Sequence, residues 1–381
     1  MRVLVATTAG SGHFGPLVPF AVALKEAGHD VAVAAPESFA AAVTRAGFVH
    51  QPFGDASQEE LGAVFATLPG RSNEEGNALV IGEVFGRIDT RAALPAMAAM
   101  VAEWKPDLIV RETCEFASYI AAEAAGVPHA QVAVGLAAFE ERGVGVLEEP
   151  LTSLGAEPGL AGLRAAPRLT MVPESFEDPA ATGGEGTRRF RDGVVTGNAD
   201  PLPDWWRDES DPLVYVTFGS VAAGFGLFPD LYRAAIDVLA GVPIRVLLTL
   251  GDAGAPEALE PVPANVHVEK WWPQKAVMPH ASAMVGHGGY GTTLSGLTAG
   301  VPQVVVPLFA DQPHNARRVD AVGAGVALEG GPGAVAGLAS AVTRVLADER
   351  YRVGAGRIAA EIAGLPPASE AVPVLEALAG R

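Results

Sequence analysis

The stretch Val285-Gly286-His287-Gly288-Gly289-Tyr290-Gly291-Thr292-Thr293-Leu294 indicates the fold class of this chain. It runs from a short apolar strand into a glycine-rich turn, and then into a helix whose first turn carries two hydroxyls. The same order of strand, turn and helix recurs along the 381 residues. Alternation of this kind predicts parallel sheets that are covered by helices on both faces.

Two halves of the chain repeat the pattern. The first half predicts strands at 1–5, 30–35, 107–110 and 130–134, with helices at about 17–27, 37–46 and 115–125. The second half predicts strands at 213–218, 244–250, 283–285 and 303–306, and helices from about 332 onward. Two stretches of weaker periodicity, 57–83 and 140–164, are predicted to be irregular insertions at the rim of the first sheet.

The fold class that follows is α/β, with two doubly wound Rossmann-like domains that face each other across a cleft. The segment 198–212 is rich in Pro and Asp and has no period, as expected of a linker. The predicted organisation is therefore a first domain at 1–197, this linker, a second domain at 213–365, and a C-terminal helix at 366–381 that packs back on the first domain.

Composition narrows the class of partner. Acidic side chains outnumber basic ones by 44 to 26, a formal net charge of −18, and this excess repels phosphate backbones and anionic lipid headgroups. We therefore expect no nucleic acid or membrane partner, no signal peptide and no membrane span. Cys114 is the single cysteine, so one chain offers no disulfide framework or multi-thiolate metal site, and we expect a cytoplasmic protein.

A glycine-rich turn near the N-terminus carries the first candidate catalytic residue. Gly10-Ser11-Gly12-His13-Phe14-Gly15 lies between a strand and a helix and satisfies the dinucleotide pattern G-x-G-x-x-G. His13 and Phe14 are bulky for a turn that must approach a pyrophosphate. An imidazole at a strand end is instead suited to act as a general base near neutral pH, although a histidine at a helix N-terminus also occurs purely as a packing or capping residue.

A general-base histidine is usually oriented by a carboxylate, and two candidates follow the strand at 107–110. Glu112 lies at the strand terminus, whereas Glu115 opens the next helix, where the helix dipole also favours a carboxylate. Arg111 is expected to pair with one of them and to leave the other for His13. The residues alone leave the choice between Glu112 and Glu115 open.

The turn around His287 is a predicted anion site. Free amides at the helix N-terminus, the hydroxyls of Thr292 and Thr293 and the N–H of His287 are suited to bind a diphosphate without a metal ion. Gly219-Ser220, at the end of the first strand of the second half, offers further amides on the same face. The alternative is ordinary helix capping by a threonine after a tight Gly288-Gly289 turn.

Two further segments carry side chains for recognising a ligand. Trp271-Trp272-Pro273-Gln274 places an indole and an amide after a strand, where they are suited to stack on a flat base and read its edge; simple packing is the alternative. Asp311-Gln312-Pro313-His314-Asn315 offers a carboxylate and two amides to a polyhydroxyl ligand, with a helix N-cap at Asp311 as the alternative.

In their order and spacing, these motifs resemble the signature of the family 1 glycosyltransferases of the GT-B fold. The resemblance is to the short actinobacterial members that glycosylate natural products in antibiotic biosynthesis, and it covers nearly the whole chain. Its most specific part is a series of four motifs: Trp271-x-Pro273-Gln274, His287-Gly288-Gly289-x-Gly291-Thr292-Thr293, Gly300-Val301-Pro302 and Asp311-Gln312-Pro313-x-Asn315.

The resemblance implies a role for each motif. The indole stacks on the nucleotide base, the His-Gly-Gly turn and its hydroxyls hold the diphosphate, and the Asp-Gln pair binds the sugar. With the amides of Gly219-Ser220, the donor-binding residues expected are Gly219, Ser220, Trp271, Gln274, His287, Gly288, Gly289, Gly291, Thr292, Thr293, Asp311 and Gln312. The match of Gly12-His13-Phe14-Gly15-Pro16 implies His13 as the base, and counting back from Gly126 gives Glu112 as its orienting acid, with Glu115 as a competitor because the family commonly has Asp.

The implied activity is inverting, metal-independent transfer of a (deoxy)sugar from a nucleotide-sugar to a hydroxyl of a small apolar acceptor, with no cofactor. Ser295 stands where the family often has a Glu that binds ribose hydroxyls, which favours a dTDP-sugar over a UDP-sugar. The acceptor is expected to contact the N-terminal insertions through Phe65, Phe85 and Phe139. The oligomeric state is left open, a homodimer included.

Three other functional classes stay open at the level of the sequence. A nucleotide-cofactor oxidoreductase would use the turn at Gly10, Gly12 and Gly15, with Glu37 as the only acid after the second strand, and would leave the anion site unexplained. A sugar-nucleotide epimerase on the same fold would consume the donor without an acceptor. A catalytically silent auxiliary protein would have no need of His13 together with intact phosphate and sugar motifs.

Overall fold

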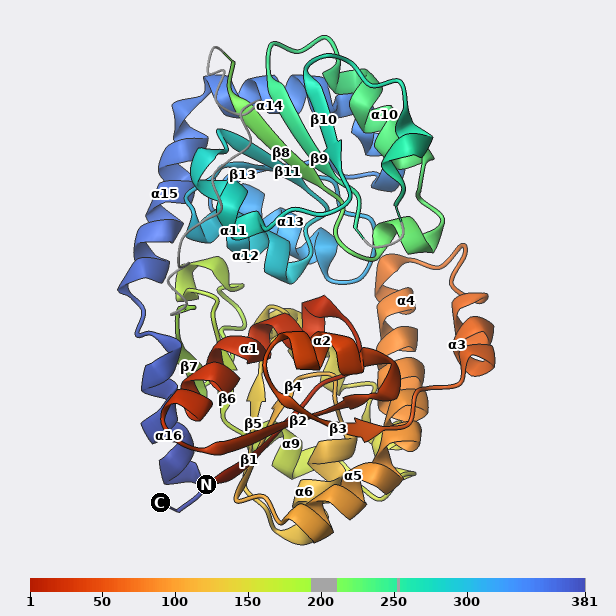
Figure 1. Cartoon of the computed structure of the whole chain (residues 1–381), viewed down its shortest axis with the longest axis vertical. Coiled ribbons are helices and arrows are strands. Elements are labelled where there is room, and N and C mark those ends of the chain that lie inside the picture. The colour runs from red at the N-terminus through yellow and green to blue at the C-terminus, as the bar shows by residue number, and fades with distance from the viewer. Residues whose placement is uncertain (193–210, 252–253, 381) are drawn as a thin grey trace. The chain divides into compact units, whose positions relative to one another are not determined.

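A computed structural model of the chain describes residues 1–192, 211–251 and 254–380 (Figure 1). The chain forms two compact units. Unit 1 comprises Met1–Val172, Glu177–Val194 and Leu365–Arg381, and unit 2 comprises Pro173–Phe176 and Val195–Gly364. Nearly all of the predicted linker, 198–210, lies outside the described residues.

Unit 1 is built on a seven-stranded sheet, counted over the described residues, in which every pair of neighbours is parallel. The strand order is β3-β2-β1-β4-β5-β6-β7. The strands are β1 (Arg2–Ala6), β2 (Asp30–Pro36), β3 (Val49–Phe53), β4 (Leu108–Glu112), β5 (His129–Val132), β6 (Arg168–Thr170) and β7 (Thr187–Arg189). The helices are α1 (Ser11–Glu26), α2 (Ala40–Arg45), α3 (Gln58–Phe65), α4 (Asn73–Leu79), a π-helix (Val80–Asp89), α5 (Thr90–Trp104), α6 (Ala117–Ala125), α7 (Ala137–Val144), α8 (Glu148–Thr152), α9 (Ala161–Ala165) and α16 (Ala371–Leu378).

The core of unit 1 follows from apolar strands that are buried on both faces. Alternate side chains of β1, β2 and β4 pack against α5 and α6, with Leu4, Ile109 and Met97 completely buried. On the other face of the sheet lie α1 and α16 (Figure 1). Because both faces are covered there, β1 and β2 carry continuous apolar runs, Val3–Ala6 and Val31–Ala35, rather than alternating ones, which is the pattern that predicted a parallel sheet.

The C-terminal residues belong to unit 1. Helix α16 contacts α1, and Glu376 Oε1 lies 3.1 Å from His29 Nε2. The backbone N–H of Arg191 donates to the carbonyl of Pro366 at 2.8 Å. These contacts tie the last helix to the same unit as the first strand.

Unit 2 repeats the architecture with a six-stranded parallel sheet in the described residues, ordered β10-β9-β8-β11-β12-β13. The strands are β8 (Leu213–Thr217), β9 (Arg245–Thr249), β10 (Val266–Glu269), β11 (Ala283–Gly286), β12 (Gln303–Val305) and β13 (Gly325–Ala327). The helices are α10 (Asp230–Leu239), α11 (Gln274–Val277), α12 (Tyr290–Thr298), α13 (Gln312–Ala321), α14 (Leu338–Ala347) and α15 (Glu349–Gly364). Along β8, Val214 and Val216 join one core cluster while Leu213 and Tyr215 join another, so the two faces of the strand are both buried.

One short segment departs from the predicted division, which assigned 1–197 to the first domain without interruption. Pro173–Phe176 clusters with unit 2. Arg318 on α13 donates to the carbonyls of Phe176 at 3.0 Å and Ser175 at 3.1 Å, and the Ser175 hydroxyl donates to Glu361 on α15. Backbone carbonyls thus attach this loop to the second unit.

The prediction of irregular insertions at 57–83 and 140–164 was wrong, because both stretches are largely helical. The first contains α3, α4 and the start of the π-helix, and the second contains α7, α8 and α9. Ser57 accepts a bond from the backbone N–H of Glu60, and Ser72 forms a reciprocal capping box with Glu75. These serine and glutamate pairs, three residues apart, were the available signal for helix starts.

Helix α1 also begins earlier than predicted, at Ser11 rather than near Leu17, and runs through Pro16 and Pro19. Its N-cap is Gly10, with φ of 118°, a conformation that favours glycine. No helix in the described part of the chain is long and apolar enough to cross a bilayer.

Candidate active site

In each sheet the direction in which successive strands are added reverses once, next to the first strand of that unit. The candidate residues lie at the ends of the two strands on either side of this reversal. In unit 1 the reversal lies between β1 and β4; His13 comes after β1, and Glu112 is the last residue of β4. In unit 2 it lies between β8 and β11, followed by Gly219 and His287. The carboxyl ends of strands at such a switch point are where α/β sheets bind ligands.

His13 and Glu112 form a pair in unit 1. His13 lies in the first turn of α1, with its side chain 25% exposed, and Glu112 is the last residue of β4, with its side chain 0% exposed. The distance between His13 Nδ1 and Glu112 Oε1 is 3.2 Å. A carboxylate at Nδ1 directs Nε2 away from itself, so the ring has the orientation that a general base needs.

The Glu112 carboxylate is held by other donors as well. Its Oε1 accepts from the backbone N–H of Thr8 at 3.2 Å and from the Thr8 hydroxyl at 2.9 Å, and its Oε2 accepts from the backbone N–H of Cys114 at 2.5 Å. Burial raises the pKa of Glu112, but the charge of His13 and the hydrogen bonds from His13, Cys114 and Thr8 outweigh it, so the pKa is below its usual value. The carboxylate is therefore ionised at neutral pH.

Glu115 lies elsewhere and has another role in the fold. It accepts from the backbone N–H of Ala117 at 3.0 Å and that of Ser118 at 3.1 Å, at the start of α6. Burial raises the pKa of Glu115 to about 7 against these hydrogen bonds. The expectation that Arg111 pairs with one of the two carboxylates was wrong, because its guanidinium donates to the backbone carbonyls of Glu112 and Glu115 and to the Gln131 side chain.

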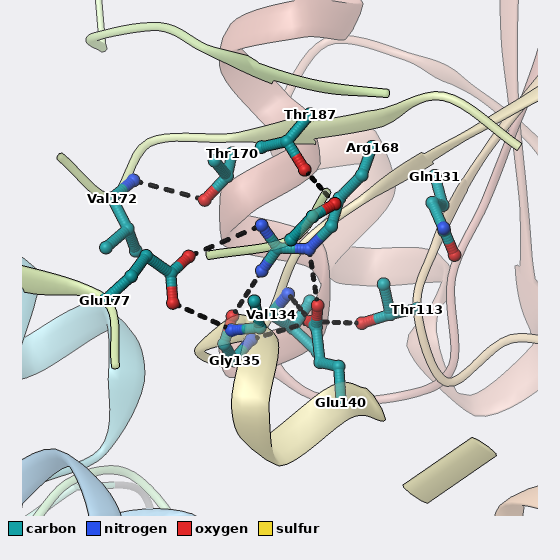
Figure 2. Close-up of polar contacts among 12 residues, drawn as sticks. Thr113, Gln131, Val134, Gly135, Glu140, Arg168, Thr170, Val172, Glu177 and Thr187 are labelled. Carbon is teal, nitrogen blue, oxygen red and sulfur yellow. Dashed lines mark hydrogen bonds and ion pairs between the residues drawn. The ribbon is translucent and has the colours of Figure 1, made fainter. Parts of the chain in front are cut away.

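A buried polar network holds the loop after β4 (Figure 2). Glu140 accepts from the Thr113 hydroxyl at 2.7 Å, from the backbone N–H groups of Val134 and Gly135 at 3.0 Å each, and from Arg168 Nε at 2.8 Å. Arg168 also lies 3.4 Å from Glu177. Since Thr113 stands between Glu112 and Cys114, the network fixes the backbone that presents Glu112. Glu140 was not among the predicted site residues, because its place in the sequence belongs to no motif.

Of the three aromatic residues predicted to contact an acceptor, Phe85 is brought to the His13 imidazole. The two ring centroids are 5.3 Å apart and the rings are inclined by 47°. Phe85 also packs on a buried apolar cluster that includes Phe116, Tyr119 and Leu147. Phe65 lies on α3 and Phe139 on α7.

In unit 2 the imidazole of His287 is enclosed between two glycines. A Cβ atom at Gly219, where φ is 82°, would lie 2.6 Å from His287 Cε1, and a Cβ at Gly289 would overlap His287 Nε2. Burial lowers the pKa of His287 to about 4, so the ring is neutral at neutral pH. Its Nδ1 is buried and has no hydrogen-bond partner among the described residues.

The start of α13 is joined to the same turn. Asn315 Nδ2 donates to the Gly288 carbonyl at 2.8 Å and to Asp311 Oδ2 at 2.6 Å, so Asp311 is brought beside the His287 turn. The Gln312 Oε1 atom accepts hydrogen bonds from the backbone N–H groups of Leu308 and Phe309 at 2.8 and 3.1 Å. The Gln312 side chain therefore stabilises the loop that precedes α13. Asn315 completes this arrangement, and its place in the Asp-Gln-Pro-x-Asn motif was the signal for it.

The other residues that were predicted to bind the nucleotide-sugar differ in how they relate to this turn. Gln274 Nε2 lies 3.4 Å from the Thr292 hydroxyl in the first turn of α12, and the Thr293 hydroxyl is buried with no partner in the described residues. A Cβ atom added at Gly291 would meet no neighbouring atom within 4 Å outside its own helix turn. Ser220 follows Gly219 in the loop after β8, which packs on the loop after β9. Trp271 is 66% exposed, and its indole is available to a ligand.

One group in the described residues has the composition of a metal site. Ligand atoms of His13, Glu112 and Cys114 lie within 4.8 Å of one another. Both Glu112 oxygens, however, already accept hydrogen bonds from protein donors. A cation there would have to compete with these donors for the carboxylate.

Comparisons with known proteins identify the family. The family model described as erythromycin biosynthesis protein CIII-like, N-terminal domain, matches residues 22–219, and the corresponding C-terminal domain matches residues 233–378. Together these matches span most of both units.

Curated relatives and solved structures agree. The chain is 31% identical to aklavinone 7-beta-L-rhodosaminyltransferase of Streptomyces galilaeus, covering 99% of this chain and 96% of that protein. It is also 31% identical to the TDP-daunosamine transferase DnrS of Streptomyces peucetius, with coverage of 100% and 97%. The crystal structure of the glycosyltransferase SsfS6 of Streptomyces sp. SF2575, complexed with thymidine diphosphate, is 30% identical with a TM-score of 0.78 and 99% coverage of each chain.

These matches favour a transferase over the oxidoreductase, epimerase and auxiliary alternatives. The relatives are named transferases, and the similarity extends over nearly the full length of both chains. Both parallel sheets match those of the GT-B enzymes. The chain therefore belongs to the EryCIII-like family, the actinobacterial family 1 glycosyltransferases of the GT-B fold that act in natural-product biosynthesis.

Proposed function

We propose that this glycosyltransferase moves a deoxysugar from a dTDP-sugar to a hydroxyl group of a small apolar natural product, with inversion at the anomeric carbon and without a metal ion. The observation that carries the proposal is the His13–Glu112 pair, 3.2 Å apart at the switch point of the first sheet. A base so oriented is the group that transfer to a hydroxyl requires.

In the proposed reaction His13 removes the proton of the acceptor hydroxyl, and Glu112 stabilises the imidazolium that forms. The acceptor oxygen bonds to the anomeric carbon of the sugar as the bond from that carbon to the phosphate oxygen breaks. The electron pair of the broken bond leaves with the diphosphate. Attack on the face opposite the leaving group inverts the configuration.

The leaving diphosphate is proposed to bind at the turn between β11 and α12. Amides at the N-terminus of α12 and the buried Nδ1 of His287 supply hydrogen bonds there. Since His287 is neutral, it contributes a directed N–H and no charge. The overall charge of −18 gives no attraction to an anion either, so neutral donors carry the binding.

Support for a thymidine nucleotide comes from two directions. Ser295, in α12, lacks the reach and charge to hold a ribose 2′-hydroxyl, which favours a deoxyribose nucleotide over a UDP-sugar. The similar SsfS6 structure contains thymidine diphosphate, and the similar DnrS protein is named a TDP-daunosamine transferase. The acceptor is proposed to lie on the apolar wall around Phe85, beside His13.

The test is a transfer assay with a panel of polycyclic aromatic and macrolide aglycones and a dTDP-deoxysugar, read by mass spectrometry. His13→Ala should lose about 10²–10⁴-fold of the transfer rate, while dTDP binding measured by calorimetry stays unchanged. Unchanged turnover in His13→Ala would overturn the assignment of the base.

A further inference from the structure

The segment Val80–Asp89 is a π-helix, a wide helix that is rare and often marks functional sites. Its turn is supported at the C-terminal end by the Thr90 hydroxyl, which donates to the carbonyl of Phe85, five residues earlier, at 2.7 Å. One face carries Gly82 and Gly86 toward the chain at 146–150: a Cβ at Gly86 would lie 2.9 Å from Leu147 Cδ2 and 3.3 Å from Pro150 Cβ. The glycines allow this close approach and so fix the rotation of the helix.

In that orientation, other side chains of the π-helix face the pair formed by His13 and Glu112. The ring of Phe85 lies against that of His13, with the centroids 5.3 Å apart. In a helix whose hydrogen bonds span five residues, positions four or five apart share a face. Asp89 therefore follows Phe85 on the side of His13, and the charges of His13 and Glu112 both act on its carboxyl group.

Asp89 is a largely buried carboxyl group without a compensating cation of its own. Burial raises the pKa of Asp89 to about 6; the charge of His13 lowers it and that of Glu112 raises it, and no lysine or arginine of the described residues contributes. The arginines on either side are engaged with other carboxylates, Arg87 with Glu83 and Glu149 and Arg91 with Glu60. A buried acid whose charged neighbours are a histidine and a second carboxylate is a functional candidate rather than a stabilising one.

We propose that Asp89 is a positioning residue for the base, the second carboxylate that stabilises His13 in its protonated form. This role of Asp89 rests on the proposed function, in which His13 is the base for transfer. Glu112 holds Nδ1 of the ring, and Asp89 adds a second negative charge from the π-helix. When His13 takes the acceptor proton, the new positive charge is balanced by both carboxylates, which strengthens the base in a partly buried site.

The experiment is an NMR titration of the His13 imidazole in the nucleotide-free protein, with the resonance assigned by its loss in His13→Gln. The isosteric variant Asp89→Asn should lower the titration midpoint of His13 by about 0.5 to 1 pH unit, a three- to tenfold loss of proton affinity. The matched control is Glu103→Gln, which removes one negative charge from the exposed face of α5, about 21 Å along the helix from Asp89, and should leave the midpoint unchanged.

Kinetics then separate this proposal from the function on which it rests. The acid limb of kcat/KM in Asp89→Asn should move to lower pH by the same amount as the NMR midpoint, with KM for the donor unchanged. An unchanged His13 midpoint, or the same shift in Glu103→Gln, overturns the role of Asp89 whatever the activity. A midpoint that moves while the kcat/KM profile does not would instead refute His13 as the base.

Discussion

Replacing Glu112 by Gln tests which carboxylate serves the base. The substitution keeps the shape of a completely buried side chain but removes its charge. An amide can accept at only one of its two ends, whereas the carboxylate accepts at both: from Thr8 and His13 at Oε1, and from Cys114 at Oε2. At least one buried donor therefore loses its acceptor, and His13 loses the charge 3.2 Å from Nδ1.

The size of the effect follows from these losses. Removing an opposite charge at this distance lowers the pKa of a base by about 1 to 3 units. Because the rate of proton transfer follows base strength with Brønsted behaviour, about half of that change, in logarithmic units, appears in the rate. Loss of the fixed ring orientation adds to it. We expect kcat in Glu112→Gln to fall about 10²- to 10³-fold.

The matched control is Glu115→Gln. Glu115 is equally buried and three residues away, but it binds the backbone at the start of α6, and its pKa of about 7 means that it is already half protonated at neutral pH. Glutamine resembles that protonated form, so kcat should stay within about threefold. The assay is steady-state transfer, with dTDP affinity by calorimetry to confirm a folded donor site. A kcat for Glu112→Gln within threefold of wild type, or an equal loss in Glu115→Gln, would refute the assignment.

Four further outcomes are expected. Gly289→Ala should abolish dTDP binding in calorimetry, because its Cβ would overlap the His287 ring, whereas Gly241→Ala, with no atom within 4 Å of the new Cβ, should not; equal affinities would contradict the enclosed histidine. The folded-state pKa of His287, about 4 against an ordinary 6.5, means that unit 2 loses stability as pH falls from about 6.5 toward 4, by about 3 kcal/mol, and His287→Gln should flatten that loss in urea unfolding. Burial raises the folded-state pKa of Asp89 to about 6 from an ordinary 3.8, so the effect of pH on stability has the opposite sign: the ionised carboxyl group destabilises the folded protein as pH rises from about 3.8 to 6. Asp89→Asn should therefore raise the free energy of unfolding by about 1 to 3 kcal/mol at pH 7.5 and leave it unchanged at pH 3. No increase at pH 7.5 would contradict the burial of Asp89. Transfer measured in EDTA should equal transfer with added Mg²⁺, and a requirement for Mg²⁺ would contradict donor binding by neutral groups.

Much of the fold was predictable because both sheets are parallel and buried on both faces. Such strands are short, mostly apolar runs that are fully buried, as in β8, and they alternate with helices in a way that leaves few other topologies. The candidate residues were predictable for a related reason: His13, Glu112 and His287 all lie at or just after the carboxyl ends of strands beside a switch point.

The residues alone left the choice between Glu112 and Glu115 open, and only the family resemblance pointed to Glu112. The choice depends on where β4 ends and on the pleat, which directs successive side chains to opposite faces of the sheet. Because β4 continues to Glu112, that residue points away from Arg111 and reaches His13. A strand ending at 110, as the apolar run suggested, leaves both carboxylates in a loop.

The helical insertions escaped prediction because their helices are short and polar. In α3 and α4 no residue is buried, so no apolar stripe marks the helical period, and serine caps are the main signal. No helix was predicted over residues 80–89, so the alignment of Phe85 with Asp89, four residues apart on one helix face, did not emerge from the sequence. Asp89 was missed for this reason.

Calorimetric titration of the protein with dTDP and with UDP, in EDTA, tests the central claim most directly, because it needs no knowledge of the acceptor. We predict one dTDP bound per chain without metal and at least about fivefold more tightly than UDP, a difference of about 1 kcal/mol. Binding of UDP as tightly as dTDP, or binding of dTDP only when a divalent cation is present, would contradict a dTDP-sugar site built from the neutral donors around His287.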